Sequence, residues 1–157
     1  MPNNLFPIGY ENEVMTEEEV KEPFVGYRPG IAFDFYQGDF MLDGKNMMLR
    51  STGIESWKAW CYNCVSTQRY RHLAYGTDFG VNSEPAFRAK SQEEAESWLT
   101  REITEAILAD PYQRTKYIED MTFEWPMPDT ILVHLVLHGI DDVTIDFDVT
   151  LKGGEQS

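Results

Sequence analysis

Two cysteines separated by two residues are the first candidates for chemistry in this sequence. Cys61 and Cys64 have the C-x-x-C spacing of redox-active dithiols and of half a zinc site. A reactive thiolate needs a helix N-terminus or a nearby cation, and a zinc ion needs four ligands, of which only His72 is close in sequence. Both cysteines fall in the middle of a predicted helix on its apolar stripe, so we predict that they pack in the core. A small metal or redox module is the alternative.

Two histidines raise the question of a metal site a second time. His134 and His138 are four residues apart in a predicted strand, where this spacing places both side chains on the same face. The H-E-x-x-H helix of the zinc proteases does not surround them. We therefore predict histidines that face solvent or a partner, and no metal site.

Carboxylate pairs are the third candidate, because glycosidases place an acid and a base or nucleophile at a fixed separation. Glu93, Glu94 and Glu96 open a predicted helix, where they complement its dipole. Asp146 and Asp148 alternate with apolar residues on the solvent side of a predicted strand. The sequence holds no nucleophile elbow, phosphate-binding glycine loop or dinucleotide fingerprint. It therefore predicts neither a catalytic residue nor a cofactor.

Residues 67–80 gather cations and aromatic rings within an acidic protein. The basic and aromatic members are Arg69, Tyr70, Arg71, His72, Tyr75 and Phe79. Arginines in such a loop pair with carboxylates or stack on rings. Two interpretations of Arg69 stay open: it ties the loop to acids of its own chain, or it faces a partner.

Helices that carry these residues are predicted from capping and periodicity. A capping-box pattern at Thr52 precedes apolar residues at helical spacing over residues 53–66. The same pattern at Ser91 precedes a second helix, which Asp110 and Pro111 end.

Strands are predicted on both sides of the helices. Short aromatic-rich runs over residues 31–50, separated by turns, predict a β-meander. Residues 116–125, 131–137 and 143–151 predict three antiparallel strands. The fold class is therefore α+β, with two main helices packed on one face of a mainly antiparallel sheet.

Composition bounds the partners and the domain organisation. The chain has 157 residues, a net charge of −14 and no cluster of basic residues, which disfavours nucleic acid and anionic membranes as direct partners. The acidity fits either a partner with a basic face or solubility alone. We expect an acidic extended arm (1–30), one α+β domain (31–151) and a polar tail (152–157). The N-terminus lacks a signal pattern, so we expect assembly in the cytoplasm.

The order of several motifs resembles the XkdS-like proteins of prophage tail operons, which are related to the sheath-initiating baseplate wedge family of contractile tails. The resemblance covers residues 31–151. The motifs that carry it are Phe33-Asp34-Phe35, Gly38-Asp39-Phe40, Leu42-Asp43-Gly44, Gly53-Ile54-Glu55, Thr67-Gln68-Arg69-Tyr70-Arg71, Tyr75-Gly76-Thr77-Asp78-Phe79-Gly80, Ile107-Leu108 and Asp110-Pro111.

The resemblance implies a structural, non-enzymatic subunit of a baseplate ring that binds other wedge subunits and the tail sheath protein and helps to template the sheath. The family carries a Glu-Pro-Arg element; here Ala86 follows Glu84 and Pro85, and Arg88 comes two positions later. The predicted partner-binding residues are Thr67, Arg69, Arg71, Tyr75, Phe79, Gly80, Glu84, Pro85 and Arg88. Some wedge proteins are described as lysozyme-like, so a peptidoglycan hydrolase using Glu84 and Glu94 is the rival.

Overall fold

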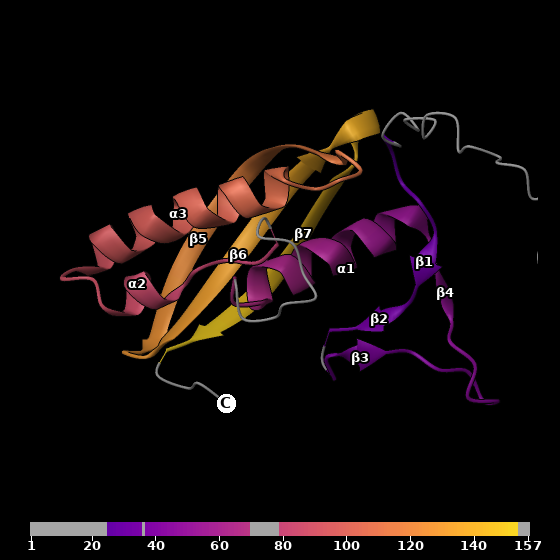
Figure 1. The fold of residues 1–157 in the computed structure, drawn as a ribbon, viewed down its shortest axis with the longest axis horizontal. Helices are drawn as coiled ribbons and strands as arrows, with labels where there is room; N and C mark the ends of the chain where they lie inside the picture. Colours follow the sequence, from indigo (N-terminus) through magenta and orange to yellow (C-terminus); the bar gives the residue numbers. More distant parts are fainter. Residues whose placement is uncertain (1–24, 36, 70–78, 154–157) are drawn as a thin grey trace, which may run out of the picture.

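Residues 115–152 form a three-stranded antiparallel sheet (Figure 1). The computed structural model describes residues 25–35, 37–69 and 79–153. Strands β5 (Thr115–Met127), β6 (Thr130–Gly139) and β7 (Thr144–Lys152) lie in the order β5-β6-β7. The predicted strands are confirmed, and β5 and β7 are the two edges of this sheet.

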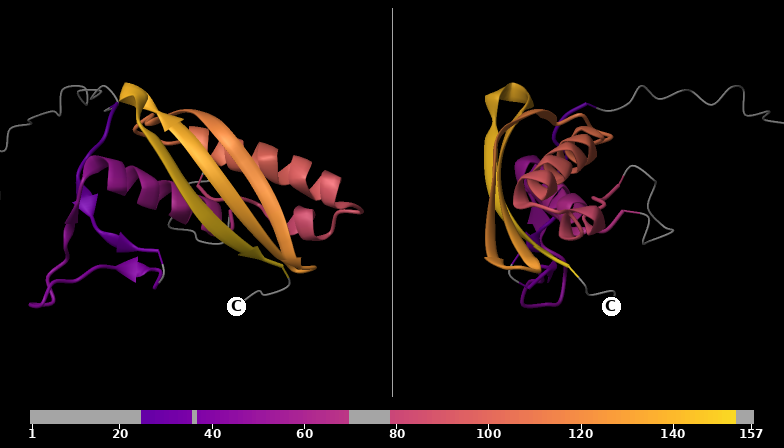
Figure 2. Two further views of the ribbon diagram at one scale, coloured as in Figure 1. Left: turned by 180° about the vertical axis from the view of Figure 1, so that it is seen from behind. Right: turned by 90° about the vertical axis from the view of Figure 1, so that its left-hand side faces the viewer.

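Two helices cover the same face of the sheet, as predicted (Figure 2). Helix α1 (Gly53–Ser66) is capped by Thr52, the residue before it. The Thr52 side chain accepts a hydrogen bond from the backbone amide of Glu55, and the Glu55 carboxylate accepts one from the backbone amide of Thr52. Helix α3 (Gln92–Leu108) is capped by Ser91, whose hydroxyl accepts a hydrogen bond from the backbone amide of Glu94. Each cap satisfies amides that the first turn leaves without a partner in the helix.

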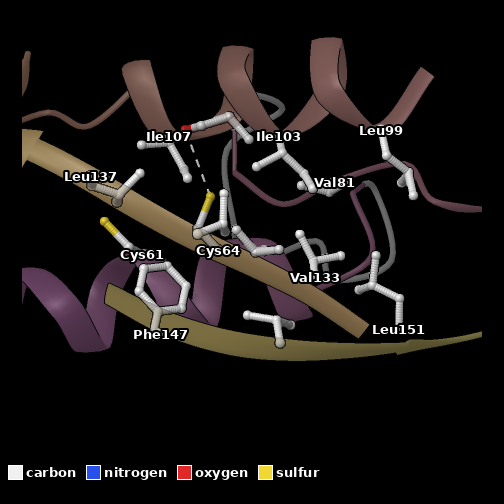
Figure 3. Packing of buried hydrophobic residues seen from close by; sticks show 14 of the residues in the cluster. Cys61, Cys64, Val81, Leu99, Ile103, Ile107, Val133, Leu137, Phe147 and Leu151 are labelled. Carbon is white, nitrogen blue, oxygen red and sulfur yellow. Dashed lines mark hydrogen bonds between the residues drawn. The ribbon is translucent and has the colours of Figure 1, made fainter. Parts of the chain in front are cut away.

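The core lies between these helices and the sheet (Figure 3). On β7, and on β6 from Ile131 onward, residues alternate between buried and more exposed positions, because successive side chains of a strand point to opposite faces. The largest fully buried side chains are Trp57, Leu99, Ile103, Ile107, Ile131, Leu135 and Leu137. The α+β fold class is thus confirmed, with a single packed layer of helices on the sheet.

The N-terminal strands are short, and their pairing differs from a simple meander. Strand β1 (Gly30–Ile31) pairs with β4 (Arg50–Ser51), and β2 (Phe33–Asp34) pairs with β3 (Asp39–Phe40), both antiparallel. The pairing switches at Ala32, whose amide donates to the Leu49 carbonyl and whose carbonyl accepts from the Met41 amide. The third run of the predicted meander therefore returns to the first.

Two smaller elements complete the fold. Helix α2 (Glu84–Phe87) follows the predicted loop of residues 67–80, in a segment where the sequence predicted no helix, and η1 (Ile140–Asp142) forms the turn between β6 and β7. Residues 25–30 lie against the domain: the Tyr27 hydroxyl donates to the Ile140 carbonyl over 2.7 Å, and its ring contacts Trp57. No helix in the described part of the chain is long and apolar enough to cross a membrane.

Candidate functional site

The loop that carries the predicted contact residues is closed at its base by backbone pairing. The Val81 amide donates to the Thr67 carbonyl over 2.9 Å, and the Arg69 amide donates to the Val81 carbonyl over 3.2 Å. Gly80 has φ +95°, and a Cβ there would lie 2.8 Å from the Thr67 carbonyl oxygen, so a glycine is required. We call residues 67–69 and 80–83 the loop base; residues 70–78, with Arg71 and Tyr75, lie outside the described residues.

Side chains add a polar network to the loop base. The side-chain amide of Gln68 donates a hydrogen bond to the side-chain oxygen of Asn82 over 2.9 Å and accepts one from the Ser83 hydroxyl over 3.0 Å. The Trp98 indole on α3 donates to the Asn82 carbonyl over 2.8 Å. These bonds attach the loop base to the second helix.

Arg69 turns inward at this base. Its Nε donates to the Gly80 carbonyl over 3.1 Å, and its guanidinium lies 3.7 Å from the Glu102 carboxylate and 3.9 Å from that of Glu105. The side chains of Arg69 and Glu102 are each 9% exposed, and Glu102 also accepts from the Asn82 amide. Of the two interpretations of Arg69, the geometry favours the one in which it binds acids of its own chain.

The remaining predicted contact residues lie next to the loop base and at α2. Phe79 is half-buried, and its ring packs edge-on against Trp60 with centroids 5.9 Å apart. Glu84 and Pro85 open α2, and exposed Glu84 pairs with exposed Arg88 one turn later. The structure therefore places Arg88 where it forms an ion pair with the first residue of the Glu84-Pro85 element.

A groove of about 530 Å³ connects α2 to the end of β7. Its walls combine apolar and charged side chains from α1, the loop base, α2 and β7, among them Val65, Gln68, Glu84, Phe87, Leu151 and Lys152. The groove therefore offers both apolar surface and hydrogen-bonding groups to a ligand.

The outer edge of β7 presents backbone groups that pair with no other strand in the described part of the chain. The Gly139 amide donates to the Val143 carbonyl, and the Gly153 amide donates to the Asp129 carbonyl, which fixes the odd-numbered residues of β7 as the ones bonded to β6. The even-numbered residues, from Thr144 to Thr150, therefore direct their N–H and C=O groups away from β6. No other described strand pairs with β7.

The opposite edge is less suited to pairing. Strand β5 contains Pro126, and its register with β6 shifts at three places. Proline and bulges are the usual devices that prevent a strand edge from pairing with another chain. Because β7 keeps an unbroken register with β6 and contains no proline, it is the edge to which a partner strand can be added.

The histidines lie on the outer face of the sheet, on the same side of β6, as predicted. His134 pairs with Asp148 on the neighbouring strand β7, and the His134 side chain is 40% exposed. His138 stacks on Tyr117 with ring centroids 4.8 Å apart, and its Nε2 lies 3.5 Å from Asp142. Among the described residues no group of three or more His, Cys, Asp or Glu side chains could hold a metal ion.

The cysteines are buried, so the prediction that they pack in the core is confirmed. Both are free thiols, and the Cys64 Sγ lies 3.7 Å from the Ala106 carbonyl oxygen, to which it donates (Figure 3). Burial raises the pKa of Cys64 to about 11 and raises the pKa of Cys61 further. Neither thiol is therefore a thiolate at neutral pH, which is the form that redox exchange and zinc binding need.

The carboxylates of the rival hydrolase hypothesis are separated by their surroundings. Glu84 is on the wall of the groove beside β7 and pairs with Arg88. Glu94 is on the wall of a different depression, and its carboxylate accepts from the Lys90 amide. Each acid thus has a local partner, and the two do not face one cavity together.

A buried ion pair that was not predicted from the sequence lies beside the start of β5. The Arg114 guanidinium donates to both oxygens of the Asp110 carboxylate over 2.7 and 2.9 Å, and both side chains are at most 3% exposed. Asp110 also accepts from the amides of Tyr112 and Arg114. The four-residue spacing of Asp110 and Arg114 is the signal in the sequence that indicates this ion pair, but Asp110 was predicted only to end a helix.

A comparison with models of protein families gives a match. The family model of the contractile injection system sheath initiator matches residues 30–134, which run from β1 into β6 and include the loop base, α2 and both long helices. The search of curated proteins finds no match for the chain.

Proposed function

The chain belongs to the contractile injection system sheath initiator family, and from this premise we propose that it forms part of a baseplate ring, binds neighbouring wedge subunits and starts sheath assembly by pairing its β7 edge with a strand of the sheath protein. Members of this family are structural components of contractile injection systems. The observation that carries the finer proposal is the free, regular edge of β7.

The chemistry of β7 describes the strand that it would accept. Its outward side chains include Asp146 and Asp148, while its inward side chains, such as Val149, are already buried in the core. A partner strand that places Lys or Arg opposite these acids would gain opposite-charge cross-strand pairs, worth about 0.2–1 kcal/mol each. Main-chain hydrogen bonds would supply affinity, and the charges would select the partner.

The groove at the end of β7 supports the same proposal. A strand added along the outer edge runs toward Thr150 and Lys152, which line the groove together with α2. The end of the added segment can thus continue into the groove, next to Glu84 and Arg88. The proposed sheath site and the predicted contact residues of α2 are therefore continuous.

Wedge subunits would contact the loop base and the loop that it carries. Arg71, Tyr75 and Phe79 stay proposed contact residues, whereas the role proposed for Arg69 changes from direct contact to holding the loop base against α3. On this proposal the protein is assembled in the bacterial cytoplasm and resides in the tail baseplate, with no nucleic acid or membrane as partner.

A proline at a position of β7 whose backbone N–H points away from β6 tests the sheath site. Thr150→Pro removes an N–H at the free edge while leaving the ladder to β6 complete, because only odd-numbered residues bond to β6. Thr150→Val keeps the N–H and is the matched control. We expect the sheath protein to co-purify with the wild type and with Thr150→Val, and at least about tenfold less of it with Thr150→Pro. Equal recovery with the proline variant, at an unchanged melting temperature, would exclude the β7 edge as the sheath site.

A further inference from the structure

Exposed apolar side chains concentrate on one hairpin of the molecule. Of the twelve large hydrophobic residues that are exposed in the described part of the chain, six lie between residues 40 and 49. They are Phe40, Met41, Leu42, Met47, Met48 and Leu49, with exposed fractions from 37% to 64%. The hairpin joins β3 to β4 and projects away from the sheet and both long helices (Figures 1 and 2).

The tip of this hairpin is held in a defined conformation. The Asp43 carboxylate accepts hydrogen bonds from the amides of Lys45 and Met47 over 2.8 and 2.9 Å, and the Asp43 amide donates to the Met47 carbonyl. Asn46 has φ +59°, a turn conformation that asparagine tolerates well. Leu42 and Met48 pair across the two arms. The exposed apolar side chains are therefore presented on an ordered turn.

Neither face of the hairpin tip is covered by the rest of the described chain. Leu42 and Met48 are opposite each other and are 52% and 55% exposed, and neighbouring Met47 is 64% exposed. A contiguous exposed apolar patch of this kind marks a protein interaction site, and flexible methionine side chains adapt to the pocket that receives them. A two-stranded ribbon is also only marginally stable by itself in water.

We propose that the hairpin of residues 40–49, which we call the methionine hairpin, inserts into an apolar pocket of a different, basic subunit of the baseplate. The charge of the chain selects this occupant over a second copy: each copy carries −14, so two copies repel one another, whereas a basic subunit is attracted. The identity of the partner as a baseplate subunit rests on the proposed function. The surface itself is separate from the β7 edge.

The test compares two exposed methionine sites in the full-length chain. The double variant Met47→Ser/Met48→Ser removes apolar area from the hairpin and leaves the hydrogen bonds of Asp43 in place, because these involve backbone amides. Met127→Ser is the matched control, since Met127 at the end of β5 is 54% exposed and Met48 is 55% exposed. The probes are the purified wedge subunits and the purified sheath protein of the same particle.

We expect the double variant to bind a wedge subunit at least about tenfold more weakly than the wild type, as truncation of a central apolar anchor does, with its melting temperature and sheath binding unchanged. Met127→Ser should bind as the wild type does. Raising the salt concentration should weaken wild-type binding, because a charge difference steers the partners.

Three results would overturn the inference. Equal wedge binding by the double variant would remove the hairpin from the interface and leave the proposed function standing. A concentration-dependent dimer of the wild type that the double variant abolishes would show that the occupant is a second copy. A wild-type chain that binds neither sheath nor wedge subunits would contradict both the proposed function and this inference.

Discussion

At the scale of single residues, Arg69 shows how the structure revises a sequence interpretation. Its position in a loop of cations and rings indicated a partner contact or an internal ion pair equally well. The structure buries its guanidinium between the Gly80 carbonyl and Glu102 on α3. The sequence could not choose, because the acid that decides the matter is 33 residues away along the chain.

Arg69→Ala should therefore lower the stability of the folded chain. The substitution leaves the buried Glu102 carboxylate with fewer partners, which costs about 1–3 kcal/mol for a group of this kind. Glu105→Gln is the control: Glu105 also faces Arg69, but its side chain is 65% exposed, and exposed pairs contribute at most about 1 kcal/mol. Urea unfolding measures both, and equal midpoints for the two variants would contradict the internal role of Arg69.

The cysteines give a prediction with a defined pH dependence. Burial raises the pKa of Cys64 to about 11, so the thiolate appears only as the pH approaches that value. At pH 8 nearly all of the Cys64 side chain is therefore the neutral thiol, whereas the thiolate is the reactive form. A thiol reagent should react slowly with the native protein at both cysteines and rapidly once urea has unfolded it. Rapid labelling of the native protein would support the redox alternative that the C-x-x-C spacing left open.

At the scale of elements, the local signals predicted both long helices. The capping residues Thr52 and Ser91 mark helix starts that agree with the structure, since caps act within one turn of the chain. Helix α2 was missed because its four residues are too few for a periodic pattern. The return of β4 to β1 was also beyond the sequence, because pairing between short strands depends on contacts that periodicity does not encode.

Gly80 is the element-scale residue whose substitution should matter most for the loop base. Gly80→Ala introduces a Cβ at φ +95° and 2.8 Å from the Thr67 carbonyl, so it should destabilise the chain by about 1–3 kcal/mol. Gly44→Ala is the matched control, because a Cβ there has open space around it. Thermal unfolding should separate the two. A Gly80→Ala melting temperature equal to that of Gly44→Ala would mean that the loop base tolerates a side chain.

At the scale of the whole molecule, alternation on the C-terminal strands and the two apolar helix stripes were enough to predict the α+β fold. The partner surfaces were not predictable in the same way. The free edge of β7 depends on which strand lies in the middle of the sheet, and the exposure of the methionine hairpin depends on what the rest of the chain leaves uncovered. The family match adds what geometry alone does not supply, namely the kind of assembly in which we propose that these surfaces act.

Electron microscopy of particles assembled without this chain tests the central claim most directly. If the chain starts sheath assembly, its removal should leave tail tubes that lack an ordered sheath, and the wild-type chain or Thr150→Val should restore the sheath where Thr150→Pro does not. Tails with a complete, correctly seated sheath in the absence of the chain would contradict the account.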